Sequence, residues 1–508
     1  MGNALSGGAL YLGFDCSTQG LTALIIRPDD RTVIFRDAIA FDALFPEFGT
    51  VHGVLRSPSP GVVHAPPLMW KAALHAMVGR IASSGIDLAQ IRAISGSAQQ
   101  HGSVYCGDDV ETLARATAPV WLDTSTVREC SEIEEAVGGP ATVAQLTGSR
   151  AYPRFTGPQI RKFAREDPDA YAATSHIHLV SSYLASLLIG RHAPLDHADA
   201  SGMNLMDLRN LSWSSDAVDA TAPHLQRRLP ALVRPDTIIG TLDPPWQRTY
   251  GFPPAAVVVW SGDNPCSLVG TGLLREGQLA VSLGTSDTIF GPMDSVRVNS
   301  EGIGHVFASP LGGYMGITVF SNGSLARERV RDRCGLDWTT FSEALSATEA
   351  GNAGAMMLPW FEPEITPPVA TGSPHYFDLD PRDCRRCPRA IVESQMMTLA
   401  NHSAWMEITS PAVYVTGGAA ANREILQVMA DVFDADVRRF DATDSAALGA
   451  ALRAYQAHSG VSWEVAVEGF AGLDQASVIR PIRGNVEIYR RLRPLYAQRE
   501  LSALALRG

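Results

Sequence analysis

The chain has 508 residues, too many for one hydrophobic core, so about two or three domains are expected. Hydrophobic residues make up 45% and charged residues 19%, an ordinary composition for a globular protein. Lysine and arginine total 41 against 53 acidic residues, which gives a formal charge of −12. This excess of acid argues against a nucleic-acid partner, which would require a basic patch.

The sequence predicts a cytoplasmic protein without a membrane anchor. Its seven cysteines follow no framework spacing, and the C-x-x-C motif of Cys384 and Cys387 lacks the further ligands of a zinc site. The N-terminus lacks a basic signal segment, and the apolar-rich segment 176–190 is too short to span a bilayer. MGNALS at residues 1–6 fits an acylation pattern, but no polybasic segment supports it, so we interpret it as a chance match.

A β-hairpin is predicted over residues 9–26, ALYLGFDCSTQGLTALII. Its two apolar strands flank a turn of small polar residues that includes Asp15 and Thr18. Hydroxyls and backbone N–H groups in such a turn suit phosphate oxygens, and Asp15 could hold the water shell of a Mg²⁺ ion. The alternative is an ordinary hairpin turn.

Segment 277–291, GQLAVSLGTSDTIFG, repeats the same local plan. Its strands flank a turn that contains Gly284, Thr285 and Ser286, again without bulky side chains. The repetition is a weak internal duplication and indicates two similar α/β halves.

Between the hairpins, segment 69–81 has apolar residues at three- and four-residue steps and predicts a helix. Segment 91–105 predicts a strand and then a polar loop with Gln100 and His101, which could bind a polyhydroxylated ligand. A structural histidine is the alternative there. Aromatic neighbours could hold the guanidinium of Arg154 in place, although a surface salt bridge is an equal alternative.

The Pro-rich stretch 244–254 is interpreted as a surface connection, and we place a domain boundary near it, between residues 1–255 and 256–508. The composition of the stretch, with four prolines among eleven residues, is typical of a loop between domains.

Asp263 and Asn264 follow the apolar strand 256–260 at its end. Ligands in open α/β sheets bind outside the carboxyl ends of strands, so Asp263 could accept a proton from an alcohol as a phosphoryl group arrives. A turn-initiating aspartate is the alternative. Pro265 is expected to stiffen this loop and to hold Asn264 extended.

In the second half, segment 411–418 predicts a strand that runs into Gly417 and Gly418. Asn422 is placed to cap the helix predicted over 422–437, and glycines before a helix N-terminus allow a ligand close to the backbone. A structural turn explains the glycines equally well. Segment 445–457 predicts a small-residue helix suited to close packing.

In this order the segments resemble the FGGY carbohydrate kinase family, within the actin–hexokinase–Hsp70 superfamily, and in particular its animal-type xylulose kinase branch. The resemblance extends from about residue 11 to about residue 455. The segments that carry it are SGSAQQHGSVY, LTGSRAYPRFTGPQI, DASGMNLMDL, SGDNPCSLVG, VSLGTSDTIF, SNGSLARERVRD, EITP and TGGAAANREILQVMADVFDA.

The resemblance implies an α/β fold of two actin/hexokinase-like (ribonuclease H-like) domains with a cleft between them. The sugar side would lie in residues 1–255 and the nucleotide side in 256–508. The implied activity is ATP-dependent phosphorylation of the terminal C5 hydroxyl of D-xylulose, with Mg²⁺. The oligomeric state is left open as monomer or homodimer.

The resemblance also implies site residues, with Asp263 as the general base. Those matched to the sugar are Gln100, His101, Arg154, Asp263 and Asn264. Those matched to ATP are Asp15, Thr18, Gly284, Thr285, Ser286, Trp338, Gly417, Gly418 and Asn422, with Asp15 reaching Mg²⁺ through water.

Two segments depart from the common family pattern. The opening Asp-x-Gly-Thr is here Asp15-Cys16-Ser17-Thr18, with Thr22 near the place of a usual basic residue, and 362–367 reads EPEITP in place of Gly-Glu-Arg-Thr-Pro. Both departures also resemble the animal-type branch.

Other functions stay open from the sequence. The substrate could be another ketose or polyol, such as ribulose, fuculose or glycerol, or the chain could be a non-catalytic sugar sensor. The presence of Asp263 disfavours the sensor. A chaperone-like ATPase is disfavoured because only residues 456–508 remain for a peptide-binding domain.

Overall fold

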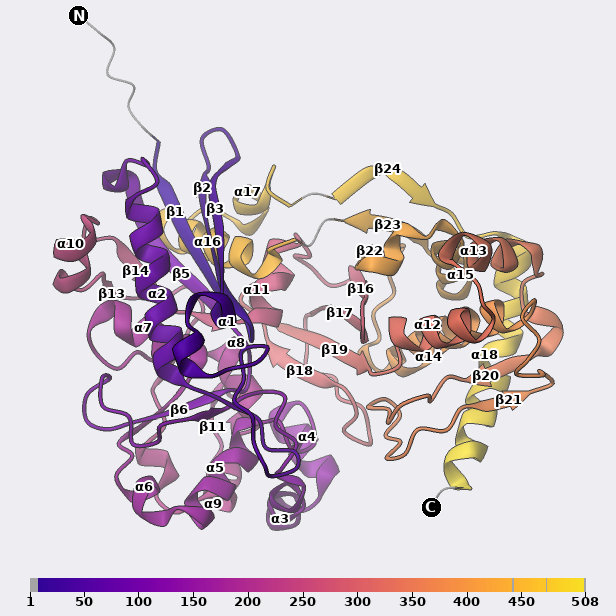
Figure 1. The fold of residues 1–508 in the computed structure, drawn as a ribbon, viewed down its shortest axis with the longest axis horizontal. Coiled ribbons are helices and arrows are strands. Elements are labelled where there is room, and N and C mark those ends of the chain that lie inside the picture. The colour runs from indigo at the N-terminus through magenta and orange to yellow at the C-terminus, as the bar shows by residue number, and fades with distance from the viewer. Residues whose placement is uncertain (1–7, 441–442, 472, 507–508) are drawn as a thin grey trace, which may run out of the picture.

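The computed structural model describes residues 8–440, 443–471 and 473–506 and shows two α/β domains side by side (Figure 1). Each domain is built on a seven-stranded mixed sheet, which confirms the predicted fold class. The MGNALS segment lies outside the described residues. Over the described ranges, none of the helices combines the length and the apolar character that crossing a bilayer requires.

The first sheet begins with the predicted hairpin, in which β1 and β2 pair antiparallel and β3 continues the meander. On its other side β1 pairs parallel with β5, which in turn pairs parallel with β14 and β15. The strands, in spatial order, are β13 (Ile238–Thr241), β14 (Ala256–Val258), β5 (Ile91–Ala98), β1 (Leu10–Cys16), β2 (Gly20–Arg27) and β3 (Thr32–Ala40), with β15 (Ser261–Gly262) also on β5.

The second sheet has the same plan, which confirms the predicted duplication. Its hairpin β16–β17 is antiparallel, and β16 pairs parallel with β22, which pairs parallel with β23. The strands, in spatial order, are β18 (His305–Ala308), β19 (Tyr314–Phe320), β17 (Asp287–Met293), β16 (Leu279–Leu283), β22 (Ala412–Thr416), β23 (Asp436–Phe440) and β24 (Leu473–Ile479).

Helices cover both faces of the first sheet. Helix α2 (Pro67–Ala82) contains the predicted helix and begins with proline at its first position, where a missing N–H costs nothing. With α7 (Val180–Ile189) it buries one face through residues such as Trp70 and Tyr183. The opposite face is covered by α16 (Ser445–Ser459), which returns from the far end of the chain (Figure 1).

The second sheet packs against α14 (Cys387–His402) and α15 (Arg423–Phe433). Asn422 caps α15 as predicted, because its side-chain oxygen accepts from the N–H groups of Glu424 and Ile425. The other helices of this domain are α12 (Ser324–Arg333), α13 (Trp338–Ala347) and α18 (Arg483–Ala505). In Figure 1 the helices α3 (Val127–Val137), α4 (Pro140–Thr147), α5 (Thr156–Glu166), α6 (Pro168–Ala172) and α9 (Ser215–Thr221) lie below the first sheet. The short helix α8 (His197–Ala200) lies closer to it.

Several local expectations fail where a helix replaces a loop. The Pro-rich stretch 244–254 contains α10 (Pro244–Tyr250), with prolines in its first turn and Gly251 in the left-handed conformation after its end. Pro265 does not hold Asn264 extended, because both lie in the first turn of α11 (Asp263–Gly270), where proline is tolerated.

Two long-range features also differ from the sequence interpretation. Although the cysteines follow no framework spacing, Cys384 is disulfide-bonded to Cys334, with a Cα–Cα distance of 5.3 Å. Strands β14 and β15 follow residue 255 but pair within the first sheet, so that sheet extends beyond the expected boundary. The assignment of the sugar to the first part and the nucleotide to the second stays a prediction.

Glycines allow α11 and α16 to cross in backbone contact, as the small-residue composition of segment 445–457 predicts. A Cβ added at Gly449 would lie 1.9 Å from the carbonyl oxygen of Cys266, and one at Gly270 would lie 1.9 Å from that of Ser445. Both obstacles are main-chain atoms, so no side-chain rotation can relieve the overlap.

We therefore expect Gly449→Ala to destabilise the protein by about 1–3 kcal/mol, the usual cost of overpacking. The matched control is Gly484→Ala in α18, where no atom lies within 4 Å of an added Cβ. The control should leave stability unchanged or slightly raised, because alanine is the better helix former. Thermal and urea midpoints measure both variants, and equal midpoints would contradict the close crossing.

Candidate active site

Asp263 lies where parallel strands of the first sheet end. Strand β5 carries β1 on one side and β15 on the other, so Ser97 of β5 is aligned with both Asp15 and Ser261. Asp263 follows β15 directly as the first residue of α11. Burial, and then the negative charge of Asp15, raise the pKa of Asp263 to about 7. A carboxylate with such a pKa can accept a proton near neutral pH.

Asp15 is the second carboxylate of this strand edge. Burial raises its pKa to about 6, and its Oδ1 atom is buried without a hydrogen-bond partner. An oxygen donor that is left unpaired in this way fits a hard cation, since Mg²⁺ binds few carboxylates and keeps several waters. Asp15 therefore suits Mg²⁺, the metal that the family resemblance implies.

Gln100 and Asn264 face the same carboxylate. The Asn264 Nδ2 group donates to Gln100 Oε1 at 2.9 Å and to Asp263 Oδ1 at 3.1 Å. Gln100 Nε2 is a buried donor without a partner. The structure thus brings three predicted sugar contacts together and leaves a donor for a further acceptor.

His101 stands beside Gln100 in a left-handed backbone conformation, with φ of 71°. The distance from its Nδ1 to the carbonyl oxygen of Gly202 is 2.7 Å, and a carbonyl only accepts, so Nδ1 carries the proton. Burial, and then the charge of Arg154, lower the pKa of His101 to about 3. The ring is neutral, and its Nε2 is free to accept from a hydroxyl.

Among the residues that the structure describes, no acidic partner forms a surface salt bridge with Arg154. Its guanidinium lies over the rings of Tyr152 and Phe155, at 5.2 and 5.8 Å from their centroids. Of the two alternatives that the sequence left open, this agrees with support by aromatic neighbours. Its Nη2 lies 2.6 Å from Nε2 of His305, a residue of the second sheet. Burial lowers the pKa of Arg154 from its usual range.

Thr18 belongs to this group of residues as well. Its hydroxyl donates to Gln99 Oε1 at 3.3 Å and accepts from Trp121 Nε1 at 2.8 Å. Trp121, which is 43% exposed, was not among the predicted site residues. A tryptophan after a short apolar run is too common a signal to have identified it.

A cavity of about 1030 Å³ lies in the second domain. Asn422 links two of its walls, because it caps α15 and donates through Nδ2 to Ser342 Oγ of α13 at 2.7 Å. Trp338, the first residue of α13, is 41% exposed. The predicted residues that line the cavity are Gly284, Thr285, Trp338, Gly418 and Asn422.

Gly417 and Ser286 complete the second group. Gly417 has φ of 92°, and an added Cβ would lie 2.4 Å from the carbonyl oxygen of Leu283, so only glycine allows this approach. Ser286 is exposed at the tip of the β16–β17 hairpin. The predicted site residues therefore form two groups, with Asp15 and Thr18 in the first domain and the second hairpin tip in the other.

A buried ion pair supports the second hairpin. Arg327 donates to both carboxylate oxygens of Asp287, at 2.9 and 3.0 Å, and to Gln395 Oε1 at 2.8 Å. Arg327 is fully buried and lines the cavity. Arg327 was not predicted as a site residue, because an arginine on a charged helix is normally a surface residue.

Comparison with known families matches both parts of the chain. The model of the N-terminal domain of the FGGY family of carbohydrate kinases matches residues 10–270. The model of the C-terminal domain of that family matches residues 279–458. The two matches fall on the two sheets described above.

Individual proteins agree with the family match. The chain is 38% identical to the xylulose kinase of Rattus norvegicus over 97% of each chain. Its fold is similar to the crystal structure of xylulose kinase from Rhodospirillum rubrum, with a TM-score of 0.85, 19% identity and coverage of 98% and 99% of the two chains. It is equally similar to gluconate kinase from Lactobacillus acidophilus, with a TM-score of 0.85, 17% identity and 98% coverage of both chains.

Proposed function

Because the chain belongs to the FGGY family of carbohydrate kinases, we propose that it transfers the γ-phosphoryl group of ATP to the terminal C5 hydroxyl of D-xylulose. The observation that carries the proposal is Asp263, a carboxylate with a pKa near 7 among neutral amide and imidazole groups. The choice of sugar rests on the 38% identity to the Rattus norvegicus xylulose kinase over nearly the whole chain.

In this proposal the first domain supplies the sugar side. Gln100 offers an unpaired donor and His101 an unprotonated nitrogen, so Gln100 can donate to one hydroxyl and His101 can accept from another. Arg154 adds a cation and Asn264 an amide beside the base. Asp263 accepts the proton of the hydroxyl that attacks, a contribution of about 10²–10⁴ in rate.

The second domain supplies the nucleotide side. The volume of about 1030 Å³ is sufficient for a nucleotide, and the exposed ring of Trp338 offers a surface for the adenine. Asn422 at a helix N-terminus, with Gly417 and Gly418 before it, allows polar groups close to the backbone. The tip of Gly284, Thr285 and Ser286 offers N–H groups and hydroxyls to the phosphates.

Asp15 would hold Mg²⁺ through water, and Thr18 would stand beside it. When bound, Mg²⁺ neutralises charge that develops on the transferred phosphoryl group. Closure of the two domains would exclude water and position the phosphoryl acceptor. A cytoplasmic location and a monomeric or homodimeric state, both expected from the sequence, remain part of the proposal.

The proposal is tested by ADP release with a panel of sugars. Since the fold is shared with a gluconate kinase, fold alone does not select the sugar. D-Xylulose should give the highest kcat/KM, above ribulose, fuculose, glycerol and gluconate. A different best substrate would reassign the sugar, whereas turnover that needs no sugar would indicate an ATPase. Sugar binding without ADP release would indicate a sensor.

Replacing Asp263 with asparagine should reduce kcat at least about 10²-fold with a modest change in sugar KM, because the amide cannot accept the proton. The matched control is Asp378→Asn, which alters an exposed carboxylate of the second domain. Near-normal turnover of the Asp263 variant would reject this residue as the base.

We expect kcat/KM for the sugar to fall as pH decreases through about 7. Burial and Asp15 raise the pKa of Asp263 to that value, and the protonated carboxyl cannot act as a base. Asp199 also faces Asp263, and burial keeps its own pKa well above the usual range. The residual activity of Asp263→Asn should lack this acid limb. A wild-type profile that stays flat down to pH 5 would contradict the assignment.

A further inference from the structure

His305 lies at the contact between the two domains. It begins β18, the edge strand of the second sheet, which reaches toward the first domain (Figure 1). The Val306 N–H donates to the carbonyl oxygen of Gly148 at 2.9 Å, and the Ala308 N–H donates to Ser201 Oγ at 3.0 Å. His305 is 3% exposed, so its position is set by both domains.

The contact with Arg154 determines which nitrogen of His305 is protonated. A guanidinium only donates, so His305 Nε2, 2.6 Å from Arg154 Nη2, must be the acceptor. The ring proton is then on Nδ1, which is buried without a partner. Burial, and then the positive charge of Arg154, hold the pKa of His305 well below its usual range, which keeps the acceptor lone pair available.

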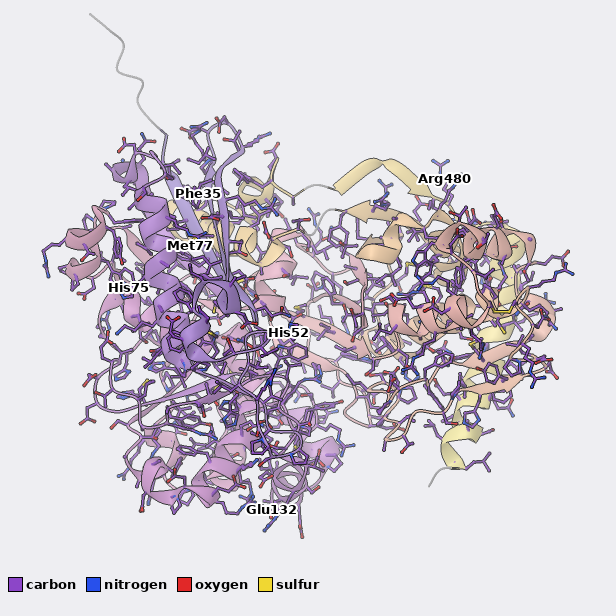
Figure 2. All side chains as sticks on the ribbon, in the orientation of Figure 1. Phe35, His52, His75, Met77, Glu132 and Arg480 are labelled. Atoms are coloured by element: carbon purple, nitrogen blue, oxygen red, sulfur yellow. A yellow bond between two sulfur atoms is a disulfide. The ribbon has the colours of Figure 1, made fainter. Side chains whose placement is uncertain are left out.

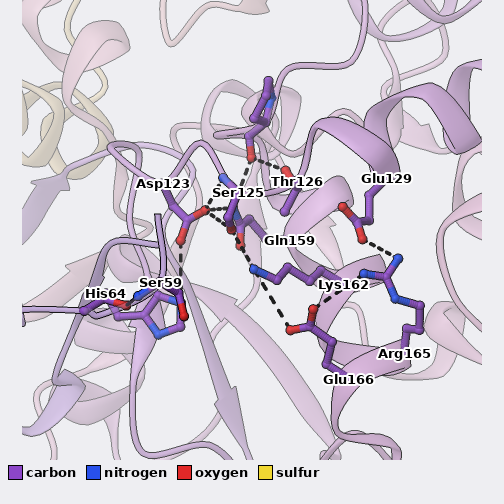
Figure 3. A network of polar contacts seen from close by, with 12 residues as sticks. Ser59, His64, Asp123, Ser125, Thr126, Glu129, Gln159, Lys162, Arg165 and Glu166 are labelled. Carbon is purple, nitrogen blue, oxygen red and sulfur yellow. Dashed lines mark hydrogen bonds and ion pairs between the residues drawn. The ribbon is translucent and has the colours of Figure 1, made fainter. Parts of the chain in front are cut away.

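A polar network of the first domain, which includes Asp123, Thr126 and Gln159, holds the backbone of the loop that carries Arg154 (Figure 3). The carbonyl oxygen of Pro153 accepts from Thr126 Oγ1 at 2.6 Å and from Gln159 Nε2 at 3.0 Å. Gln159 in turn donates to the buried carboxylate of Asp123 at 2.8 Å. The backbone beside Arg154 is therefore fixed, whereas the guanidinium itself is fixed by His305 and two aromatic rings.

The same aromatic cluster joins His305 to the predicted sugar loop. The ring of Phe155 lies 4.4 Å from that of His101 and 5.2 Å from that of His305. Tyr152 contacts His305 edge-on at 4.7 Å. The cluster thus brings the two imidazoles and the guanidinium together, with one imidazole from each domain.

We propose that His305 is a positioning residue for the sugar, supplied by the second domain, which orients the Arg154 guanidinium by accepting its Nη2 hydrogen bond. The inference rests on the proposed function of Arg154 as a sugar contact. An unpaired buried donor and a partly buried cation without a carboxylate partner in its described contacts are costly, which favours a role in binding over one in stability.

The test compares His305→Phe with His305→Gln. Phenylalanine keeps the aromatic packing but removes the acceptor, so sugar KM and the dissociation constant of the sugar without nucleotide should rise about 10- to 100-fold, with kcat and ATP KM little changed. Glutamine can present an oxygen near the Nε2 position and should recover most of the affinity. An unchanged sugar KM in His305→Phe would overturn the inference.

A double-mutant cycle with Arg154→Met separates positioning from a structural role. If His305 acts through Arg154, adding His305→Phe to Arg154→Met should have little further effect on sugar binding. Additive losses would overturn the inference. Thermal midpoints should stay close to wild type, and if His305→Phe does not fold it is replaced in the cycle by His305→Leu, which also lacks the acceptor.

The matched control is His75→Phe, which also lies in an aromatic stack, 4.1 Å from the ring of Trp246, on the outer part of the first domain (Figure 2). It should leave sugar binding unchanged. All variants are measured with the sugar that wild type phosphorylates best. A wrong sugar assignment is then seen in wild type, whereas a wrong inference about His305 is seen only in the variants.

Discussion

The candidate site depends on the parallel pairing of β5 with β1 on one side and with β15 on the other. That pairing places Asp15 and Asp263 at the same edge of one sheet, close enough for the charge of Asp15 to raise the pKa of Asp263. Burial raises the pKa of Asp15 to about 6, and burial followed by the charge of Asp15 raises the pKa of Asp263 to about 7. The arrangement lowers the stability of the fold and increases the basicity of the two carboxylates, a compromise that is typical of functional sites.

The chain stabilises this edge with a segment that is distant in sequence. Helix α16 covers the face of the first sheet opposite α2, although it follows most of the second domain. Its crossing with α11 is close enough that backbone meets backbone at Gly449 and Gly270. Since α11 begins with Asp263, the position of this carboxylate depends both on the first sheet and on α16, which follows most of the second domain. The two domains are therefore interlocked, and residues of one can serve the site of the other.

Local signals in the sequence were sufficient for much of the fold. Both hairpins, the helix capped by Asn422 and the small-residue helix α16 follow from patterns within about twenty residues. The contact of Arg154 with His305 and the buried pair of Arg327 with Asp287 could not be predicted, because each joins segments whose approach is decided by tertiary packing. The expectation that Pro265 holds Asn264 extended was wrong because proline is compatible both with an extended loop and with a first helical turn.

The duplicated plan shows how one topology can supply two chemistries. In the first sheet Asp15 is the penultimate residue of the hairpin strand β1, and its Oδ1 atom has no hydrogen-bond partner among the described residues. The parallel neighbour β5 leads into the side chains of Gln100 and His101. At the corresponding positions of the second sheet, β16 leads into the small residues Gly284, Thr285 and Ser286, and β22 leads into Gly417 and Gly418. The nearby Asp287 is paired with Arg327. The strand ends of the first sheet thus carry reactive side chains, whereas those of the second sheet present backbone that is not covered by side chains. That difference suits one edge to proton transfer and the other to binding phosphates.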